Sequence, residues 1–272
     1  MKPEYPGTDT QTEKIPAREN APSADIHPPR DAYPAGDIHG DTRPPGGSLP
    51  ARRQQMVEFG VFLFLILPSM AVSFFIAGQE EFNFRLTAMA TIFRDLALVC
   101  LVAYFAWRNG EPMPFVGWRF RDWQKEAFIG FVLFFFMYFA AGALGEALKA
   151  AGLPAAPAPR FNLDVRTPSG MALAVSLVTV VAFAEETIFR GYMILRLRNL
   201  ARSAPAAVIL SSVIFSLGHG YEGISGVITV AFIGIVLALV YMWRKSLLAP
   251  MVMHFMQDFA GIVLAPLLGK PH

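Results

Sequence analysis

The pattern of apolar and polar residues divides the chain at about residue 50. Residues 1–50 contain no apolar run and are rich in Pro, Gly, Asp and Thr, with proline pairs at Pro28-Pro29 and Pro44-Pro45. Such a segment buries too little apolar surface to offset the entropy cost of ordering it. We therefore predict a disordered, cytoplasmic tail over residues 1–50.

Seven apolar segments follow this tail. Most reach the ~20 residues that a helix needs to cross ~30 Å of hydrocarbon, and the fifth is short. They are continuous apolar runs without the period-2 alternation of a membrane barrel, so helices are favoured. The pattern predicts an all-α polytopic membrane protein with about seven, or eight, transmembrane helices. The segments are residues 57–78, 88–107, 126–151, 170–190, 206–219, 224–243 and 247–268.

Composition and charge agree with a membrane protein. Only 16% of the residues are charged, against about 25% in a soluble domain. The net charge of +2 is too small to indicate a nucleic-acid partner, so the bilayer is the expected surrounding. We divide the chain into the tail, N-terminal transmembrane helices over 51–165 and a core over 166–272.

Basic residues set the expected orientation. Every second connection between the apolar segments is basic, and the positive-inside rule places those connections and the N-terminus in the cytoplasm. No signal peptide or organelle signal is apparent, so we expect the bacterial cytoplasmic membrane. The basic residues are Arg52, Arg53, Arg108, Arg119, Arg121, Lys125, Arg196, Arg198, Arg202, Arg244 and Lys245.

Two adjacent glutamates, Glu185 and Glu186, lie in the fourth apolar segment. An ionised carboxylate in hydrocarbon costs several kcal/mol, so it indicates a function. Glu186 and Arg190 are four residues apart and share a helix face, which predicts an ion pair. Glu185 lies ~100° away around the helix. A carboxylate with no cation partner can take a proton from water, so we assign Glu185 a chemical role and Glu186 a supporting one.

Further polar residues occur in apolar segments. His219 ends the fifth, and His254 and Asp258 lie four apart in the last, on one helix face. Together with the glutamates they predict a polar site buried among the last four helices. Arg94 and Asp95, in the second segment, are interpreted as an internal ion pair or as partners for another helix. Residues 192–202 are expected to lie flat at the cytoplasmic interface.

These residues resemble a known family, the CAAX-prenyl-protease-type intramembrane proteases, also called CPBP or ABI. Its motifs are E-E-x-x-x-R, F-x-x-x-H and H-x-x-x-N or H-x-x-x-D. The resemblance covers about residues 170–265. Here the motifs are Glu185-Glu186-xxx-Arg190, Phe215-xxx-His219 and His254-xxx-Asp258.

The resemblance implies a role for each residue. Glu185 would be the catalytic base, with Glu186 and Arg190 as its supporting pair. His219 would help to activate the attacking water. His254 and Asp258 would stabilise the oxyanion, although the family often has asparagine at the last position. An ionised carboxylate repels an oxyanion, so Asp258 must be protonated or must orient His254.

The residues leave two routes open for metal. Glu185, His219 and His254 are the residues that would bind a catalytic zinc, with one position left for water. However, a zinc protease keeps its base separate from its ligands, and the chain lacks the H-E-x-x-H spacing. We therefore favour a metal-independent route that needs no cofactor.

The leading hypothesis is an intramembrane endopeptidase of the CAAX type, glutamate-dependent or metal-dependent. Its partner would be a membrane-embedded or lipidated, CAAX-like protein or peptide. The alternative is a catalytically inert binding or immunity protein of the same fold, whose function would survive Glu185→Gln. A transporter with a proton relay fits less well, because we find no inverted repeat.

Overall fold

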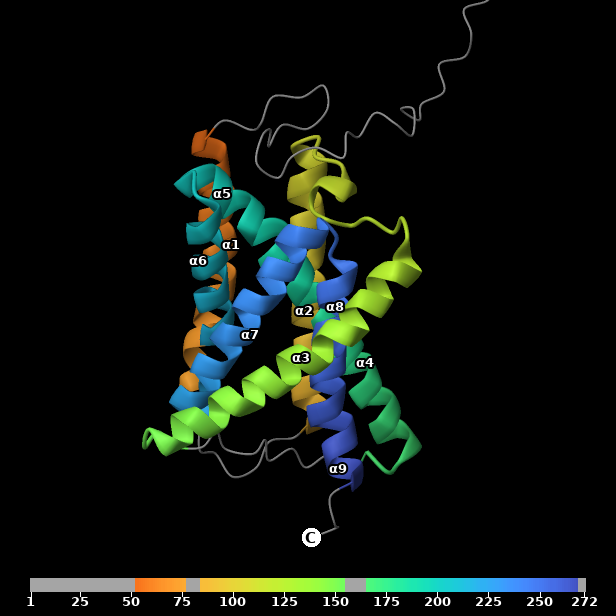
Figure 1. The fold of residues 1–272 in the computed structure, drawn as a ribbon. Coiled ribbons are helices and arrows are strands. Elements are labelled where there is room, and N and C mark those ends of the chain that lie inside the picture. Colours follow the sequence, from red (N-terminus) through yellow and green to blue (C-terminus); the bar gives the residue numbers. More distant parts are fainter. Residues whose placement is uncertain (1–51, 77–83, 155–164, 269–272) are drawn as a thin grey trace, which may run out of the picture. The chain divides into compact units, whose positions relative to one another are not determined.

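The computed structural model describes residues 52–76, 84–154 and 165–268. These residues are almost entirely helical and contain no β-strand, which confirms the predicted all-α class (Figure 1). The predicted disordered tail lies outside the described residues.

The described helices follow one another along the chain. Two of them, η2 and η4, have π-helical hydrogen bonding, and η1 and η3 are single 3-10 turns. The helices are α1 (Arg52–Ile76), α2 (Phe84–Arg108), η1 (Met113–Phe115), α3 (Trp123–Ala150), α4 (Pro168–Glu185), η2 (Glu186–Met193), α5 (Ile194–Ala201), α6 (Ala204–Leu217), η3 (Gly220–Glu222), α7 (Gly223–Arg244), α8 (Leu248–Asp258), η4 (Phe259–Leu264) and α9 (Ala265–Leu268).

Among the described residues, six helical stretches are long and apolar enough to cross a membrane, and α6 is a shorter apolar helix. They correspond one by one to the seven predicted segments, including the short fifth. This confirms a polytopic membrane protein. The six are Arg52–Phe74, Phe84–Arg108, Trp123–Ala150, Pro168–Ala201, Gly220–Arg244 and Leu248–Leu268.

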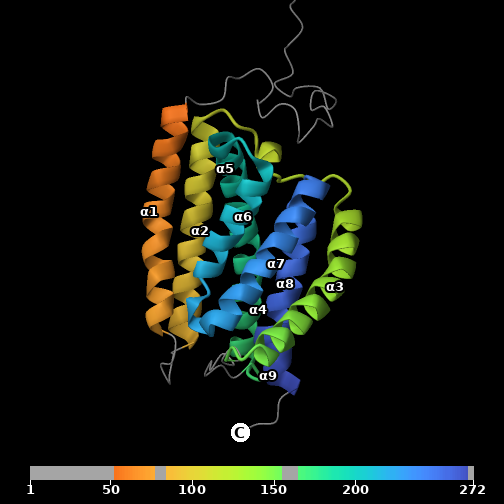
Figure 2. The ribbon, with the colours of Figure 1, turned by 60° about the vertical axis from the view of Figure 1, so that its left-hand side comes forward.

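Helix α3 runs obliquely across α7 and α8 (Figures 1 and 2). One side of α3 packs against these two helices. Phe134 and Met137 of α3 share a buried cluster with Leu237 of α7 and Met253 of α8. Its other side exposes large apolar side chains. Exposed aromatic residues on a spanning helix fit contact with lipid. They are Phe128, Phe131, Phe135, Phe136, Tyr138 and Phe139.

The α2–α3 connection, α5 and the α7–α8 connection meet at one end of the helices (Figure 2). Leu247 N donates to Gly117 O at 3.0 Å. Arg196 forms a bidentate pair with Glu111, at 2.6 and 2.7 Å, in which both side chains are fully buried. The basic connections thus share one end, as the alternation of charge predicted. That this end faces the cytoplasm stays a prediction. Arg196, which we counted among the basic residues of the connections, is instead buried in the fold.

The fourth spanning helix is longer than the sequence pattern predicted. Thr167 caps its start by accepting from Gly170 N, and the helix continues through η2 and α5 to Ala201. Residues 192–197 are all buried, so the structure differs from our expectation that residues 192–202 lie flat at an interface. The wider π turn carries the helix past Arg190, where the apolar run ends.

This longer helix brings Glu185 and His219 to the same depth in the bundle. From Glu185 the helix rises for sixteen more residues to Ala201, or about 24 Å at 1.5 Å per residue. Helix α6 then returns over the fifteen residues from Ala204 to His219, or about 22 Å. Glu185 and His219 therefore lie at similar levels in the bundle.

The Glu111–Arg196 pair yields a stability prediction. Glu111→Gln should lower the free energy of unfolding by about 3–5 kcal/mol, because it leaves the buried Arg196 charge without an anion. Unfolding in mixed micelles measures this. The control is Glu146→Gln, in an exposed pair with Lys149 at 3.7 Å, which should cost less than about 1 kcal/mol. Equal losses would contradict a structural role for the buried pair.

Candidate active site

The two glutamates lie where the helix changes its hydrogen-bonding pattern. Glu185 is the last residue of α4 and Glu186 the first of the π-helical η2. Such π turns occur frequently at functional sites. The Glu186 side chain is fully buried, whereas that of Glu185 is 14% exposed. Oε2 of Glu185 is itself buried and has no hydrogen-bond partner.

One oxygen of Glu186 accepts two hydrogen bonds. Arg190 Nη1 and His254 Nδ1 each lie 2.8 Å from Oε1 of Glu186. Arg190 also donates from Nη2 to Gly234 O at 3.3 Å, and its guanidinium lies 4.4 Å from the centre of the Phe215 ring. This network joins η2 to α6, α7 and α8.

His254 faces a carboxyl group on each side. Oε1 of Glu186 already accepts from a buried arginine, and Nδ1 of His254 is the donor in the second bond to it. The other ring nitrogen, Nε2, lies 3.5 Å from Asp258 Oδ2 and 3.8 Å from Glu185 Oε2. Neither distance is that of a strong hydrogen bond. The bond at Nδ1 thus fixes the ring and leaves Nε2 directed toward Asp258 and Glu185.

His219 lies beside this network at longer range. Its ring packs on Phe215, with centroids 5.1 Å apart, and Phe215 packs in turn on His254 at 5.9 Å. His219 Nδ1 is 3.3 Å from Phe215 O. A carbonyl oxygen only accepts, so Nδ1 carries the hydrogen and Nε2 keeps its lone pair. Asp258 is within electrostatic range of both His219 and Glu185.

The structure therefore brings Glu185, Glu186, Arg190, His254 and Asp258 into one continuous set of side chains. His219 joins them through the Phe215 ring. Phe215 stood in the sequence only as the first residue of the F-x-x-x-H motif, and its contact with both histidines and Arg190 depends on helices that are distant in sequence.

Two further contacts escaped the sequence reasoning. Trp118, in the α2–α3 connection, donates from Nε1 to Thr187 Oγ1 at 3.0 Å, directly after the glutamate pair. Asp95 of α2 is buried and within electrostatic range of Glu185 and His254. Its signal was an acidic residue in an apolar helix, which we interpreted as an ion pair with Arg94 or as a partner for another helix, without naming that helix.

The predicted zinc ligands were compared with this geometry. In the part of the chain that the structure describes, no three His, Cys, Asp or Glu side chains are spaced to hold one metal ion. Glu185, His219 and His254 therefore do not form a ligand set in this arrangement, although the bond of His254 Nδ1 to Glu186 leaves Nε2 available. The site as it stands does not fit a three-ligand zinc centre, and we derive no step through a metal.

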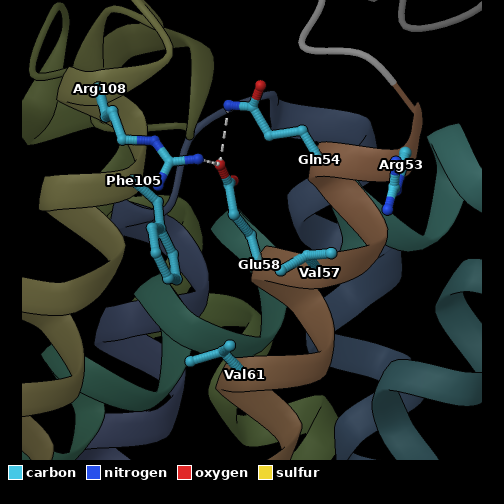
Figure 3. A pocket seen from close by; sticks show the side chains of 7 residues that line it. All are labelled: Arg53, Gln54, Val57, Glu58, Val61, Phe105 and Arg108. Atoms are coloured by element: carbon cyan, nitrogen blue, oxygen red, sulfur yellow. Dashed lines mark hydrogen bonds and ion pairs between the residues drawn. The ribbon is translucent and has the colours of Figure 1, made fainter.

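A pocket of about 390 Å³ lies between α1 and α2 (Figure 3). Val57, Val61 and Phe105 give it an apolar wall, and Glu58 and Arg108 a polar one. None of the candidate site residues lines it.

Fold and site together define a polytopic membrane protein with a buried carboxylate–imidazole centre. Residues 167–260 match the family model described as type II CAAX prenyl endopeptidase, Rce1-like. The match confirms the resemblance to the CAAX-type proteases over about a third of the chain. It includes all seven motif residues and begins well after Asp95. No curated protein and no solved structure matches the chain.

The two glutamates should differ in their effect on stability. Glu186→Gln leaves Arg190 buried without an anion and should lower the free energy of unfolding by about 3 kcal/mol or more. Glu185→Gln removes a carboxylate that has no cation bonded to it, and should change stability by less than about 1 kcal/mol. Unfolding of both variants in the same micelles tests this. A larger loss for Glu185→Gln would contradict the division of roles.

Proposed function

We propose that this protein is an intramembrane endopeptidase of the CAAX type, in which Glu185 activates a water molecule. One observation carries the proposal: Oε2 of Glu185 has no hydrogen-bond partner and faces His254 Nε2 at 3.8 Å. The neighbouring Glu186 is bonded to Arg190 and His254 through Oε1, and only its Oε2 lacks a partner. The match to a CAAX endopeptidase family supports the same activity.

Hydrolysis then proceeds by general base catalysis. Glu185 takes a proton from a water molecule as the water oxygen bonds to the carbonyl carbon of the peptide. His219 keeps the lone pair of Nε2 for a hydrogen bond from the same water. When the C–N bond breaks, the proton held by Glu185 passes to the leaving nitrogen, so that an amine and a carboxyl group are formed.

The developing oxyanion needs a donor, and His254 is placed to supply it. With Nδ1 bonded to Glu186, a proton on Nε2 is free to point to the substrate oxygen. Asp258 lies 3.5 Å from that nitrogen, on the same helix. We assign it the orienting role, since a carboxylate facing the oxyanion itself would repel it.

The substrate we propose is a membrane-embedded or lipid-modified peptide. Glu185 lies in the middle of a spanning helix of 34 residues, a depth that a soluble peptide does not reach. A lipid-modified end, as in a prenylated CAAX peptide, would place the scissile bond beside the helices.

Comparison of protein termini tests the proposed function. Membranes from cells that express the wild type or Glu185→Gln at equal levels are compared by quantitative terminomics. We expect new termini only with the wild type, since the amide cannot take a proton. Glu146→Gln, at an exposed position, serves as the matched control and should resemble the wild type.

The same termini supply a substrate for the purified protein. If the wild type and Glu185→Gln give the same termini at good coverage, the peptidase proposal fails. The fold would then serve the inert binding role. A prenylated CAAX peptide in proteoliposomes gives an independent assay of the substrate class.

Metal independence is tested on the purified protein. Treatment with EDTA and 1,10-phenanthroline should leave the cleavage rate within about twofold, because no set of His, Cys, Asp or Glu side chains among the described residues is spaced to hold a metal ion. Loss of activity that is restored by zinc would show that the site rearranges to bind metal.

A further inference from the structure

Ser73 of α1 is bonded to the backbone on both sides of His219. Its hydroxyl oxygen accepts from Gly220 N at 3.2 Å, and it lies 3.1 Å from Leu217 O and 2.6 Å from Met70 O. A hydroxyl has one hydrogen and two lone pairs. Ser73 therefore accepts from Gly220 and shares its hydrogen between the two carbonyl oxygens. Ser73 is buried, with 7% of the residue exposed.

The bonds of Ser73 lie at a turn between two helices. Helix α6 ends at Leu217 and η3 begins at Gly220, so His219 lies in the connection between them. The last carbonyl groups of a helix and the first amide groups of the next have no partner within their own helices. Ser73 supplies a partner to one group of each kind, and it does so from a helix that is distant in sequence.

Side-chain packing brings α1 against the same turn (Figure 1). A Cβ atom at Gly220 would lie 2.5 Å from Cδ2 of Phe74, so glycine at this position lets Phe74 lie against the turn. A Cβ atom at Gly218 would lie 3.8 Å from Cε of Met70, which is an ordinary contact distance. The contact between α1 and this turn therefore includes packing as well as the bonds of Ser73.

The ring of His219 is oriented by a different contact. Its Nδ1 lies 3.3 Å from Phe215 O, and the ring packs on that of Phe215. This contact sets the rotation of the ring, whereas Ser73 holds the peptide groups before and after the residue. Because the ring is attached to the turn, a shift of the turn would move Nε2, the nitrogen that the proposed mechanism directs to the attacking water.

We propose that Ser73 is a positioning residue of this active site, which acts through His219. This inference rests on the proposed function, in which Nε2 of His219 accepts a hydrogen bond from the water that Glu185 activates. Ser73 holds the turn, so that Nε2 stays within reach of that water. The family match covers residues 167–260, so the proposal adds α1, which lies outside the matched segment, to the parts of the chain that shape the site.

Ser69 provides a matched control one turn earlier on α1. Its Oγ donates to Ile66 O at 2.8 Å, which is the same bond to the third preceding residue that Ser73 makes to Met70 O. The bonds that the described residues show differ in one respect: those of Ser73 reach the His219 turn, and that of Ser69 stays within α1. Alanine at either position removes one hydroxyl from the same helix.

The experiment measures kcat and KM of Ser73→Ala and Ser69→Ala in proteoliposomes, on a substrate identified by its Glu185-dependent terminus. We expect a roughly tenfold lower kcat for Ser73→Ala, with KM within about twofold, because a displaced catalytic group slows the chemical step and leaves substrate binding in place. Ser69→Ala should keep the wild-type kcat. If Ser73→Ala does not fold, Ser73→Cys replaces it under the same criteria, since a thiol is a weak donor and a weak acceptor.

A second pair of variants separates positioning from a general loosening of the fold. In a His219→Ala background, Ser73→Ala should change kcat by less than about twofold, because the residue through which it acts is gone. A further loss of roughly tenfold in that background would overturn the proposal. A wild-type kcat in Ser73→Ala, or an equal loss in Ser69→Ala, would also overturn it.

Hydrogen exchange tests the contact without any activity. The amide of Gly220 should exchange roughly tenfold faster in Ser73→Ala than in the wild type, because its acceptor is removed. Ser69→Ala should leave this rate unchanged, and an unchanged rate in Ser73→Ala would refute the contact on which the proposal depends. If the wild type shows no Glu185-dependent cleavage, the proposed function itself fails, and the exchange rates then decide separately whether Ser73 holds the turn.

Discussion

The candidate site depends on one buried carboxylate oxygen, Oε1 of Glu186, which accepts hydrogen bonds from two nitrogen donors. Arg190 Nη1 and His254 Nδ1 both bond to Oε1 of Glu186. A buried guanidinium without an anion would cost several kcal/mol. Glu186 removes that cost and, through the same atom, fixes the ring of His254. Its neighbour Glu185 is thereby left without a bond to Arg190, and its Oε2 lies 3.8 Å from His254 Nε2.

The π turn at Glu186 makes this division possible. It follows directly on Glu185 and lets a single helix continue from Pro168 to Ala201. The glutamate pair therefore lies deep between the ends of the spanning helix, and α6 returns His219 to the same level. A polar centre at that depth suits the proposed peptidase, whose substrate would be held in the membrane.

The fold class followed from local information, because apolar runs of lipid length have few alternatives to a helix. The i, i+4 spacing likewise placed Glu186 beside Arg190. Local patterns did not reveal the bond from His254 to Glu186, which joins residues 68 positions apart. They also missed the bonds of Ser73 on α1 to the turn that carries His219. The continuation beyond Arg190 was missed because Arg196 and Arg198 resemble loop residues until Glu111 is seen to neutralise Arg196.

The central claim is that Glu186 holds the cation and the imidazole so that Glu185 is left for water. An experimental structure of the wild-type protein in lipid, with anomalous data at the zinc edge, tests it most directly. The account predicts Arg190 and His254 on Glu186, and an ordered water on Glu185 Oε2. A zinc ion bound by Glu185, His219 and His254, or Arg190 bonded to Glu185, would contradict it.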